Sequence, residues 1–322
     1  MEIVSVDIGG THARFAFAKV EGGRVATLGA AITLKTAEHA SLQTAWEAFG
    51  AQAGRPLPRA AAIAAACPIA GDMLKLTNNP WIIRPASIGA QLGVETHVLI
   101  NDFGAVGHAV ASLDPAHFTS VCGPERTLGA EEVTTIVGPG TGLGVAQIVR
   151  RGGHAQIIET EGGHIDFAPL DTLEDAILAR LRQRYRRVSV ERILSGSGLT
   201  EIYQALAAIE GRAVSTQDDK ALWTLALDGS DNLAAAALDR FCLCLGSVVG
   251  DLALAQGGTA VVIAGGLGQR LARHLPGSGF AQRFAAKGRF EARMAAIPVK
   301  LVTHPQPGLY GAAAAYAREY PE

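Results

Sequence analysis

The stretch Val6-Asp7-Ile8-Gly9-Gly10-Thr11 near the N-terminus and its counterpart Val137-Gly138-Pro139-Gly140-Thr141-Gly142-Leu143-Gly144 in mid-chain decide the fold. Each glycine-threonine turn lies between two apolar, strand-like runs, so each is predicted to occupy the tip of a β-hairpin. Glycines let backbone N–H groups approach an anion without interference from side chains, and the threonine hydroxyl adds a donor. Two such turns predict a clamp for a polyphosphate.

The residues around the first turn predict an antiparallel meander followed by α/β alternation. Strands are expected at residues 3–6, 14–20 and 24–28, a helix at 42–53, and a central strand of small residues at 60–66.

A further strand at residues 98–100 ends at Asn101-Asp102, and a helix is expected directly after it at 103–113. Open α/β sheets bind ligands at the carboxyl ends of their strands, which favours a chemical role for this pair. The Asp102 carboxylate suits a general base, and it equally suits an N-cap in front of Phe103. The local sequence leaves both roles open.

The second half of the chain repeats the pattern. The strands expected there, at 134–137, 144–150 and 154–158, lead to the polar loop Glu161-Gly162-Gly163-His164. Helices at 172–185, 198–209, 220–227 and 232–255 are followed by a buried strand at 260–264, the pair Gly265-Gly266 and a terminal helix at 308–318. This recurrence predicts a duplicated α/β architecture with a cleft between its halves.

Composition favours a soluble globular protein. The chain has 322 residues, 48% of them hydrophobic, and a formal net charge of -2 with scattered basic residues, which argues against a nucleic-acid surface. The dense basic run at residues 180–187 is interpreted as the solvated face of a helix. We expect no signal peptide, no membrane span and a cytoplasmic protein whose four cysteines are reduced and lack metal-ligand spacing.

Several motifs in a fixed order then identify a family resemblance. With the two glycine turns they are Asn101-Asp102-Phe103, Glu161-Gly162-Gly163-His164-Ile165-Asp166-Phe167 and Ala264-Gly265-Gly266. Stretches 66–72, 77–81, 190–196 and 304–311 extend the match over almost the full length. The chain closely resembles the bacterial glucokinases, and it lacks the zinc-binding cysteine motif of the related repressor-type sugar kinases.

The resemblance implies the actin-like ATPase (ribonuclease H-like) fold, with two α/β domains around a central cleft. The small domain is expected at residues 1–112 plus 304–322 and the large one at 113–303. The implied reaction is transfer of phosphate from ATP, with Mg²⁺, to the 6-hydroxyl of glucose. A homodimer is expected by analogy with the family.

On the sugar side, the resemblance makes Asp102 the base that accepts the proton of the attacking hydroxyl. A sugar needs many polar partners in its pocket, because each unpaired hydroxyl is costly. His164 has two alternative interpretations, a core histidine or a metal ligand. The residues expected to bind glucose are Asn78, Asn101, Asp102, Glu161, His164 and Glu191.

On the nucleotide side, a carboxylate beside phosphates makes sense only if a cation lies between them, so Asp7 is expected to hold Mg²⁺ through water. Gly265 and Gly266 would let the adenosine lie against bare backbone, although a strand-to-helix turn explains the pair equally. The residues expected to bind the nucleotide are Asp7, Gly9, Gly10, Thr11, Gly140, Thr141, Gly142, Gly265 and Gly266.

Two positions depart from the family pattern. His12 stands where the family usually has asparagine, and Pro139 where it usually has alanine. Proline removes one N–H donor, but the neighbouring glycine amides and Thr141 remain, so we expect phosphate binding to survive. His12 is interpreted either as a modulator of nucleotide affinity or as a surface histidine at a turn.

Two other functions remain as alternatives. A kinase for another hexose would keep the fold and change the acceptor, and polyphosphate or ADP could replace ATP as the donor. A sugar-sensing regulator would need a DNA-reading module, typically before the first strand, whereas the strand here begins at Ile3.

Overall fold

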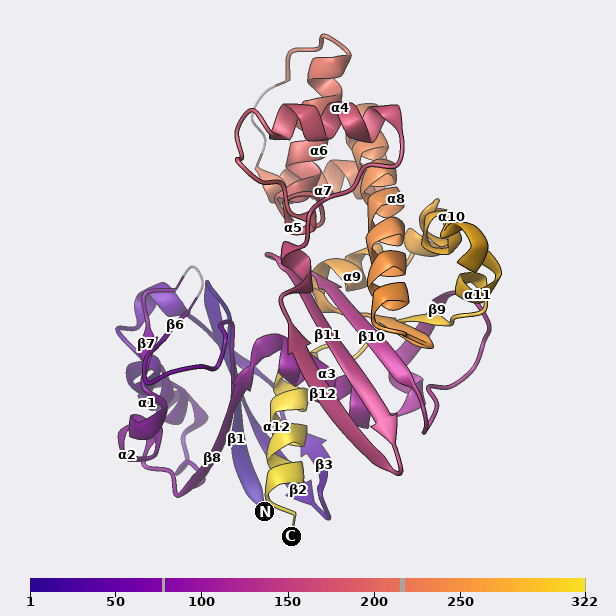
Figure 1. Cartoon of the computed structure of the whole chain (residues 1–322). Helices are drawn as coiled ribbons and strands as arrows, with labels where there is room; N and C mark the ends of the chain where they lie inside the picture. Colours follow the sequence, from indigo (N-terminus) through magenta and orange to yellow (C-terminus); the bar gives the residue numbers. More distant parts are fainter. Residues whose placement is uncertain (77–78, 215–217, 322) are drawn as a thin grey trace. The chain divides into compact units, whose positions relative to one another are not determined.

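The computed structural model describes residues 1–76, 79–214 and 218–321, and the chain divides into two compact units (Figure 1). Unit 1 comprises Met1–Asp114, Ile157–Glu159 and His304–Glu322, and unit 2 comprises Pro115–Gln156 and Thr160–Thr303.

The main sheet of unit 1 has the strand order β3-β2-β1-β5-β8, with β4 paired to β2. Its first three strands form the predicted antiparallel meander, and β5 and β8 follow in parallel to β1. The strands of this sheet are β1 (Glu2–Ile8), β2 (His12–Glu21), β3 (Arg24–Leu28), β4 (Ile32–Lys35), β5 (Ala60–Ala65) and β8 (Thr96–Asn101). Strands β6 (Leu74–Lys75) and β7 (Ile82–Ile83) form a separate antiparallel hairpin. The helices are α1 (Leu42–Ala53), α2 (Ile88–Leu92), α3 (Asp102–Ser112) and α12 (Pro307–Glu319).

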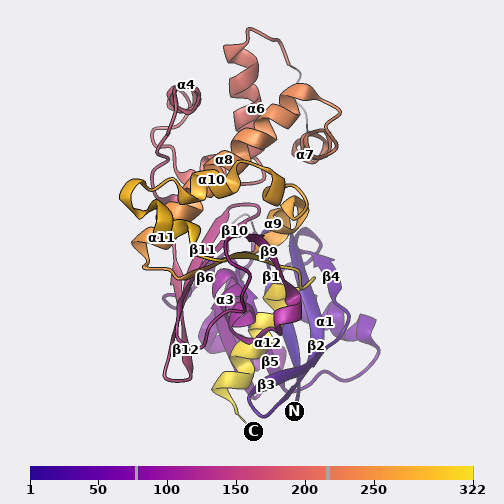
Figure 2. The same cartoon turned by 90° about the vertical axis from the view of Figure 1, so that its right-hand side faces the viewer.

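Strand β5 is buried on both faces, and its alternation sorts the core of unit 1 into two layers. Ala61 and Ile63 pack with side chains of α1 and α2, whereas Ala62 and Ala64 pack with those of α3 and α12. Helices α3 and α12 lie side by side on that second face (Figures 1 and 2). The small side chains of the strand therefore let two helices approach the sheet closely.

Helix α1 has the bounds expected from sequence because its ends carry clear signals. Ser41 and Thr44 form a capping box, with Ser41 Oγ accepting from Thr44 N at 3.3 Å and Ser41 N donating to Thr44 Oγ1 at 3.1 Å. Gly54 ends the helix with φ +64°, a left-handed conformation that favours glycine.

The main sheet of unit 2 has the order β12-β11-β10-β13-β14-β9, which repeats the meander-then-parallel arrangement of unit 1. The predicted duplication is therefore confirmed. Its strands are β9 (Phe118–Cys122), β10 (Val133–Pro139), β11 (Leu143–Arg151), β12 (His154–Thr160), β13 (Ala260–Ile263) and β14 (Val299–Val302). Its helices are α4 (Thr172–Leu181), α5 (Val190–Ile193), α6 (Gly198–Ile209), α7 (Asp219–Asp228), α8 (Asn232–Ala255), α9 (Gly265–Leu271), α10 (Phe280–Ala285) and α11 (Glu291–Ala295).

Helix α8 forms the centre of the helical part of unit 2, in contact with α6, α7 and α10. By length and composition it is the one helix in the described ranges that could cross a membrane, but 72% of its apolar window is buried inside the protein. Most of its apolar surface therefore belongs to the core of unit 2.

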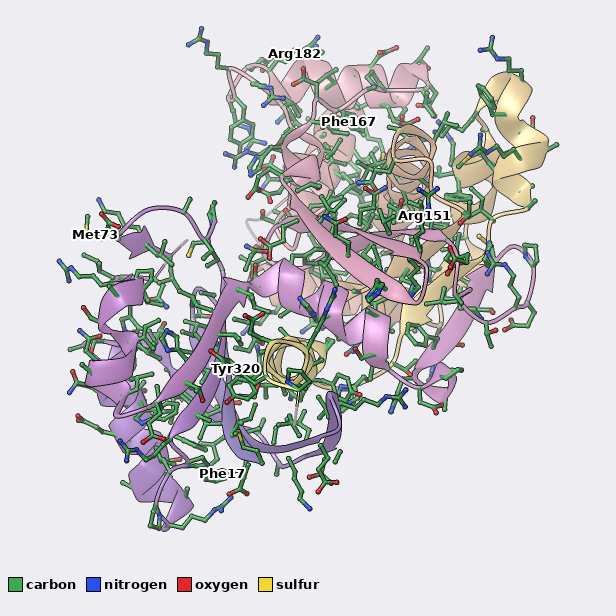
Figure 3. The ribbon with its side chains drawn as sticks, turned by 60° about the horizontal axis from the view of Figure 1, so that its bottom comes forward. Phe17, Met73, Arg151, Phe167, Arg182 and Tyr320 are labelled. Atoms are coloured by element: carbon green, nitrogen blue, oxygen red, sulfur yellow. The ribbon has the colours of Figure 1, made fainter. Side chains whose placement is uncertain are left out.

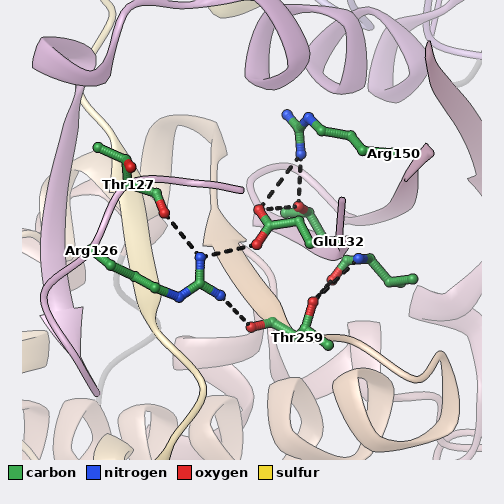
Figure 4. Close-up of polar contacts among 7 residues, drawn as sticks. Arg126, Thr127, Glu132, Arg150 and Thr259 are labelled. Carbon is green, nitrogen blue, oxygen red and sulfur yellow. Dashed lines mark hydrogen bonds and ion pairs between the residues drawn. The ribbon is translucent and has the colours of Figure 1, made fainter. Parts of the chain in front are cut away.

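A polar cluster around the buried Glu132 carboxylate fixes the start of β10 (Figure 4). The Glu132 side chain is 4% exposed and accepts from Arg126 Nη1 at 3.0 Å, while Arg150 lies 3.8 Å from its other oxygen. Arg126 also donates to the Thr259 carbonyl at 2.9 Å, just before β13. Burial lowers the pKa of Arg150, and the Glu132 carboxylate opposes that shift. The cluster holds β10 and β13 together at the end opposite their glycine turns.

One expected helix was too long. The predicted helix 172–185 ends at Leu181, and the chain continues in turns through Gln183 and Arg184. The arginines that follow are exposed, as expected of a solvated face, and Figure 3 shows Arg182 directed away from the protein. The cysteines are free thiols, in line with the reduced state predicted.

Candidate functional site

The first glycine turn and the Asn101-Asp102 pair lie at the same edge of the unit 1 sheet. In the parallel register, Ile8 pairs with Ala65 and Ala65 pairs with Asn101, so β1, β5 and β8 end in one row. This row places the turn that follows β1 and the residues that follow β8 at neighbouring strand ends. The edge is the position at which open α/β sheets bind their ligands.

Asn101, and not Asp102, caps helix α3. Its Oδ1 accepts from Phe103 N at 2.8 Å and from Gly104 N at 3.2 Å, and its Nδ2 donates to the Cys67 carbonyl at 3.1 Å. Asp102 is the first residue of the helix, and one carboxylate oxygen also accepts from Phe103 N at 2.9 Å. The N-cap interpretation of Asp102 is therefore wrong, because the preceding amide already fills that role.

The first glycine turn has the hairpin-tip geometry expected from sequence. Gly9 N donates to the His12 carbonyl at 2.9 Å, so this N–H closes the turn and does not point outward. In the described part of the chain, no protein acceptor is bonded to the N–H of Gly10 or Thr11. Asn79 Nδ2 donates to the Gly9 carbonyl at 3.1 Å and so holds the turn from the outside. Two consecutive N–H groups are thus available to an anion.

Asp7 lies next to this turn with its side chain 18% exposed, and Arg14 Nη1 approaches its carboxylate at 3.3 Å. A Cβ on Gly308, in the first turn of α12, would come within 2.7 Å of Asp7 Oδ2, so a side chain there would displace the carboxylate. Burial raises the pKa of Asp7, and the Arg14 guanidinium acts in the opposite direction.

The surroundings of Asp7 decide what kind of cation site it could form. No cluster of three or more His, Cys, Asp or Glu side chains that could hold a metal ion occurs among the described residues. A single carboxylate does not form a cage, but it suits Mg²⁺ that is carried by nucleotide phosphates and keeps its waters. The residues present therefore fit a water-mediated contact.

His12, the first residue of β2, is exposed, with its Nδ1 2.9 Å from Thr11 Oγ1. It is a surface histidine, as one of the two interpretations expected. Its ring shares a hydrogen bond with the hydroxyl that was expected to contact phosphate.

The second glycine turn joins β10 to β11. Gly140 N donates to the Gly142 carbonyl at 2.8 Å, and within the described ranges the N–H groups of Thr141 and Gly142 are not bonded to a protein acceptor. Pro139 is buried as the last residue of β10, and a Cβ on Gly265 would come within 2.8 Å of its carbonyl oxygen. Pro139, which has no N–H, therefore lies within the strand and not at the tip of the turn.

Gly265 adopts φ +81° at the start of α9, so it also serves the strand-to-helix turn proposed as the alternative. Gly266 is exposed, and a Cβ there would meet nothing within 4 Å. The open backbone surface thus lies at Gly266.

The polar loop after β12 forms a short 3₁₀ turn, Gly162–His164. Gly163 is buried against the Leu143 carbonyl, too close for any side chain. Glu161 and His164 are both exposed, so the core-histidine interpretation of His164 is wrong. The described residues around His164 form no metal-ligand cluster either.

Glu191, from α5, lies against the second glycine turn. Its Oε2 accepts from Leu143 N at 2.9 Å, and a Cβ on Gly142 would overlap the same oxygen. Glu191 was expected to contact the sugar only, and a separation of 48 residues in sequence left no signal for this contact.

Asn78 lies outside the described residues. Arg14 was missed by the sequence analysis, although it is the direct cross-strand neighbour of Asp7 in the β1–β2 hairpin and the register could have revealed it. Asn79 shapes the loop, since its Oδ1 accepts from Trp81 N at 2.9 Å.

Comparison with known proteins gives a consistent result. A family model described as Glucokinase matches residues 4–319. A curated glucokinase of Zymomonas mobilis is 66% identical over all of this chain and 99% of its own length. The crystal structure of a glucokinase from an Antarctic psychrotroph is 32% identical, covers 98% of both chains and has a TM-score of 0.83.

A more distant structure shares the fold. A ROK-family glucokinase from Streptomyces griseus, solved in complex with glucose and AMPPNP, is 19% identical over 99% of this chain and 100% of its own, with a TM-score of 0.66.

Proposed function

This chain belongs to the glucokinase family, and from that premise we propose how its residues carry out the transfer of phosphate from ATP to glucose. The fold is that of the actin-like ATPases, as the resemblance implied. The observation that carries the proposal is the shared row of strand ends, which puts Asp102 and the first glycine turn at one edge of the unit 1 sheet.

Asp102 is the proposed catalytic base. Phosphoryl transfer requires the acceptor hydroxyl in line with the γ-phosphate and little covalent work from the protein. A carboxylate fixed at the start of α3 can accept the proton of the 6-hydroxyl as that oxygen attacks phosphorus. Because Asn101 caps the helix, Asp102 is not needed as the cap.

The sugar is proposed to bind polar and charged side chains from several segments of the chain. Glu161 and His164 project from a turn that Gly163 holds against β11, and Glu191 follows a backbone bridge to that same loop. Glucose bound to the Streptomyces griseus enzyme supports this substrate. The proposed ligands are Asn78, Asn101, Asp102, Glu161, His164 and Glu191.

The nucleotide phosphates are proposed to bind the two glycine turns. Gly10 and Thr11 in one turn, and Thr141 and Gly142 in the other, offer N–H groups to an anion. Gly9 and Gly140 shape the turns, Gly265 shapes the start of α9, and Gly266 leaves room for the adenosine. AMPPNP in the Streptomyces griseus structure supports a nucleoside triphosphate as the donor.

Mg²⁺ is proposed to reach the site with the nucleotide. Asp7 would hold it through water, beside the first turn. The ion would supply positive charge that offsets the charge of the transferring phosphoryl group. Before the nucleotide binds, Arg14 would keep the Asp7 carboxylate oriented.

The setting of the enzyme follows from its family and composition. We propose a cytoplasmic enzyme that binds neither nucleic acid nor membranes, and that forms a homodimer. Units 1 and 2 are proposed to be its small and large domains.

A coupled assay tests the function. The chain is mixed with Mg²⁺ and a panel of glucose, mannose, fructose and N-acetylglucosamine, with ATP, ADP or polyphosphate as donor. We expect glucose with ATP to give the highest kcat/KM. Faster turnover of another hexose would reassign the acceptor, and ATP hydrolysis that exceeds phosphorylation of every sugar would refute the proposal.

A further inference from the structure

Glu191 contacts the second glycine turn of unit 2, and the residues just before it are bonded to those that directly follow the loop Glu161–His164. Its Oε2 is bonded to Leu143 N at 2.9 Å, at the end of the turn that is proposed to hold the nucleotide phosphates. A Cβ on Gly142 would overlap that oxygen, so the turn and the carboxylate are in direct contact. A change in the position of one must therefore displace the other.

The segment that carries Glu191 is tied by its backbone to the sugar loop. Val190 N donates to the Ile165 carbonyl at 2.9 Å, Phe167 N donates to the Val188 carbonyl at 3.0 Å, and Asp166 and Ser189 form a β-bridge. These bonds lie directly after His164 and directly before Glu191. The two sugar-binding segments are thus held together as one piece.

The same segment also holds the far side of the phosphate turn. Gly196 N, which follows α5, donates to the Gly140 carbonyl at 2.8 Å. Trp223 Nε1 in turn donates to the Gly196 carbonyl at 2.8 Å, and the Trp223 ring is buried. The turn is therefore bonded at both Gly140 and Leu143 to residues 191–196.

We propose that Glu191 couples sugar binding to nucleotide binding by dividing its two oxygens between them. Oε2 positions the phosphate turn through Leu143 N, while Oε1, which has no hydrogen-bond partner among the described residues, accepts from a sugar hydroxyl. A sugar that fixes the carboxylate then fixes the N–H groups of Thr141 and Gly142. This inference rests on the proposed function and gives Glu191 a positioning role within it.

The coupling is reciprocal by thermodynamic necessity. If glucose tightens nucleotide binding by some factor, the nucleotide tightens glucose binding by the same factor. The quantity to measure is the ratio of AMPPNP dissociation constants, with Mg²⁺ present, without and with saturating glucose. For the wild-type chain we expect a ratio of at least about fivefold, the lower end of ordinary allosteric coupling.

Two glycines of the same turn provide a matched pair of variants. In Gly142→Ala the new Cβ displaces the carboxylate, so the ratio should fall to within twofold of one. In Gly140→Ala the new Cβ meets nothing within 4 Å, so the ratio should stay near that of the wild type even if phosphate affinity changes. Neither glycine has a positive φ, so alanine is tolerated by the backbone at both positions.

Variants of Glu191 itself complete the test. Glu191→Ala should abolish the coupling, and Glu191→Gln should retain it, because an amide oxygen can still accept from Leu143 N. His164→Ala should weaken glucose binding but keep the ratio once glucose saturates. Calorimetric titration gives each constant, and circular dichroism confirms that each variant is folded.

The outcomes separate the two proposals. Three outcomes would each overturn the role of Glu191. The wild-type chain could bind both ligands with a ratio of AMPPNP dissociation constants of one, or this ratio could be equal in Gly142→Ala and Gly140→Ala. The third such outcome is a Glu191→Gln variant that loses the coupling as Glu191→Ala does. A wild-type chain that does not bind glucose at all would instead refute the proposed function.

Discussion

Asn101 and Asp102 are adjacent in sequence, but their side chains have different roles, which their hydrogen bonds distinguish. Asn101 uses its carbonyl oxygen to cap α3 and its amide nitrogen to reach Cys67. Local sequence could not assign these roles, because aspartate and asparagine are both good N-caps. Only the register of helix α3, which begins at Asp102, decides which of the two is the cap.

Asp102→Asn should therefore fold normally and lose turnover. An amide keeps the size of the side chain and its bond to Phe103 N, but it cannot accept a proton as a carboxylate does. We expect kcat to fall by roughly 10²- to 10⁴-fold, the usual worth of general base catalysis, with much less change in glucose affinity. Steady-state kinetics and calorimetry measure the two effects. Glu47→Gln, an exposed carboxylate on α1, serves as the control, and retained activity in Asp102→Asn would remove Asp102 as the base.

Asp7 should make the chain less stable at neutral pH than an uncharged residue would. Because burial raises its pKa in the folded state above that in the unfolded chain, the folded state binds the proton more tightly, and stability falls as pH rises through this range. Asp7→Asn should thus raise the melting temperature at pH 7, and this gain should shrink as the pH falls below about 4, near the ordinary pKa of aspartate.

Arg14→Gln is the matched comparison for that experiment. It removes the guanidinium that opposes the pKa shift of Asp7, so it should lower the melting temperature at pH 7. Thermal scans at several pH values measure both variants. A pH-independent difference between Asp7→Asn and the wild type would contradict the assigned cause.

At the scale of whole elements, long helices with clear end signals were predicted best. Helices α1, α6 and α8 have the bounds expected from the sequence, because capping residues and glycines mark their ends. Helix 172–185 was extended too far, since its arginines favour a helix and no glycine or proline lies between Leu181 and Tyr185.

The elements that sequence analysis missed are short or lie at sheet edges. Strand β4 pairs only with β2, and β9 pairs with β14 at the end of its sheet, so neither has the continuous apolar run of a central strand. Helices α9, α10 and α11 have at most seven residues, too few to establish a helical period. Their positions depend on tertiary packing and not on local pattern.

Gly311→Ala should destabilise the pairing of α3 with α12. A Cβ on Gly311 would overlap the carbonyl oxygen of Ala105, and neither helix backbone can move without disturbing the alanine-rich layer beneath. Overpacking of this kind costs about 1–3 kcal/mol. Gly277→Ala, whose Cβ would meet nothing within 4 Å, should change stability far less. Urea unfolding compares the two, and equal midpoints would show that the helices have room to separate.

At the scale of the whole chain, the two units share one plan. Each has a three-stranded meander followed by parallel strands, and each carries a glycine turn between the first two strands of its meander. The repeated glycine turns and the strand-helix alternation were enough to predict this duplication. The bonds from Glu191 and Gly196 to the second turn could not be predicted, because they join segments far apart in sequence. Both end on backbone groups of the turn, Leu143 N and the Gly140 carbonyl, which carry no signal in the sequence.

The proposed sugar residues come from both units, and this makes a prediction about the whole chain. Asn101 and Asp102 belong to unit 1, whereas Glu161, His164 and Glu191 belong to unit 2. A bound ligand slows hydrogen exchange chiefly in the segments that it contacts, because it opposes their local opening. Glucose should therefore slow hydrogen exchange in peptides that span residues 101–104 and also in those that span 161–164 and 190–194.

Strand β9 provides the internal reference for that exchange experiment, because it contains none of the proposed ligands. A sugar that proves inert in the coupled assay provides the external one, and it should leave every peptide unchanged. Protection confined to peptides of one unit would mean that the sugar binds there alone, and the ligands assigned to the other unit would have to be withdrawn. Protection in all three peptides is expected if Asp102 is the base and Glu161, His164 and Glu191 hold the same sugar.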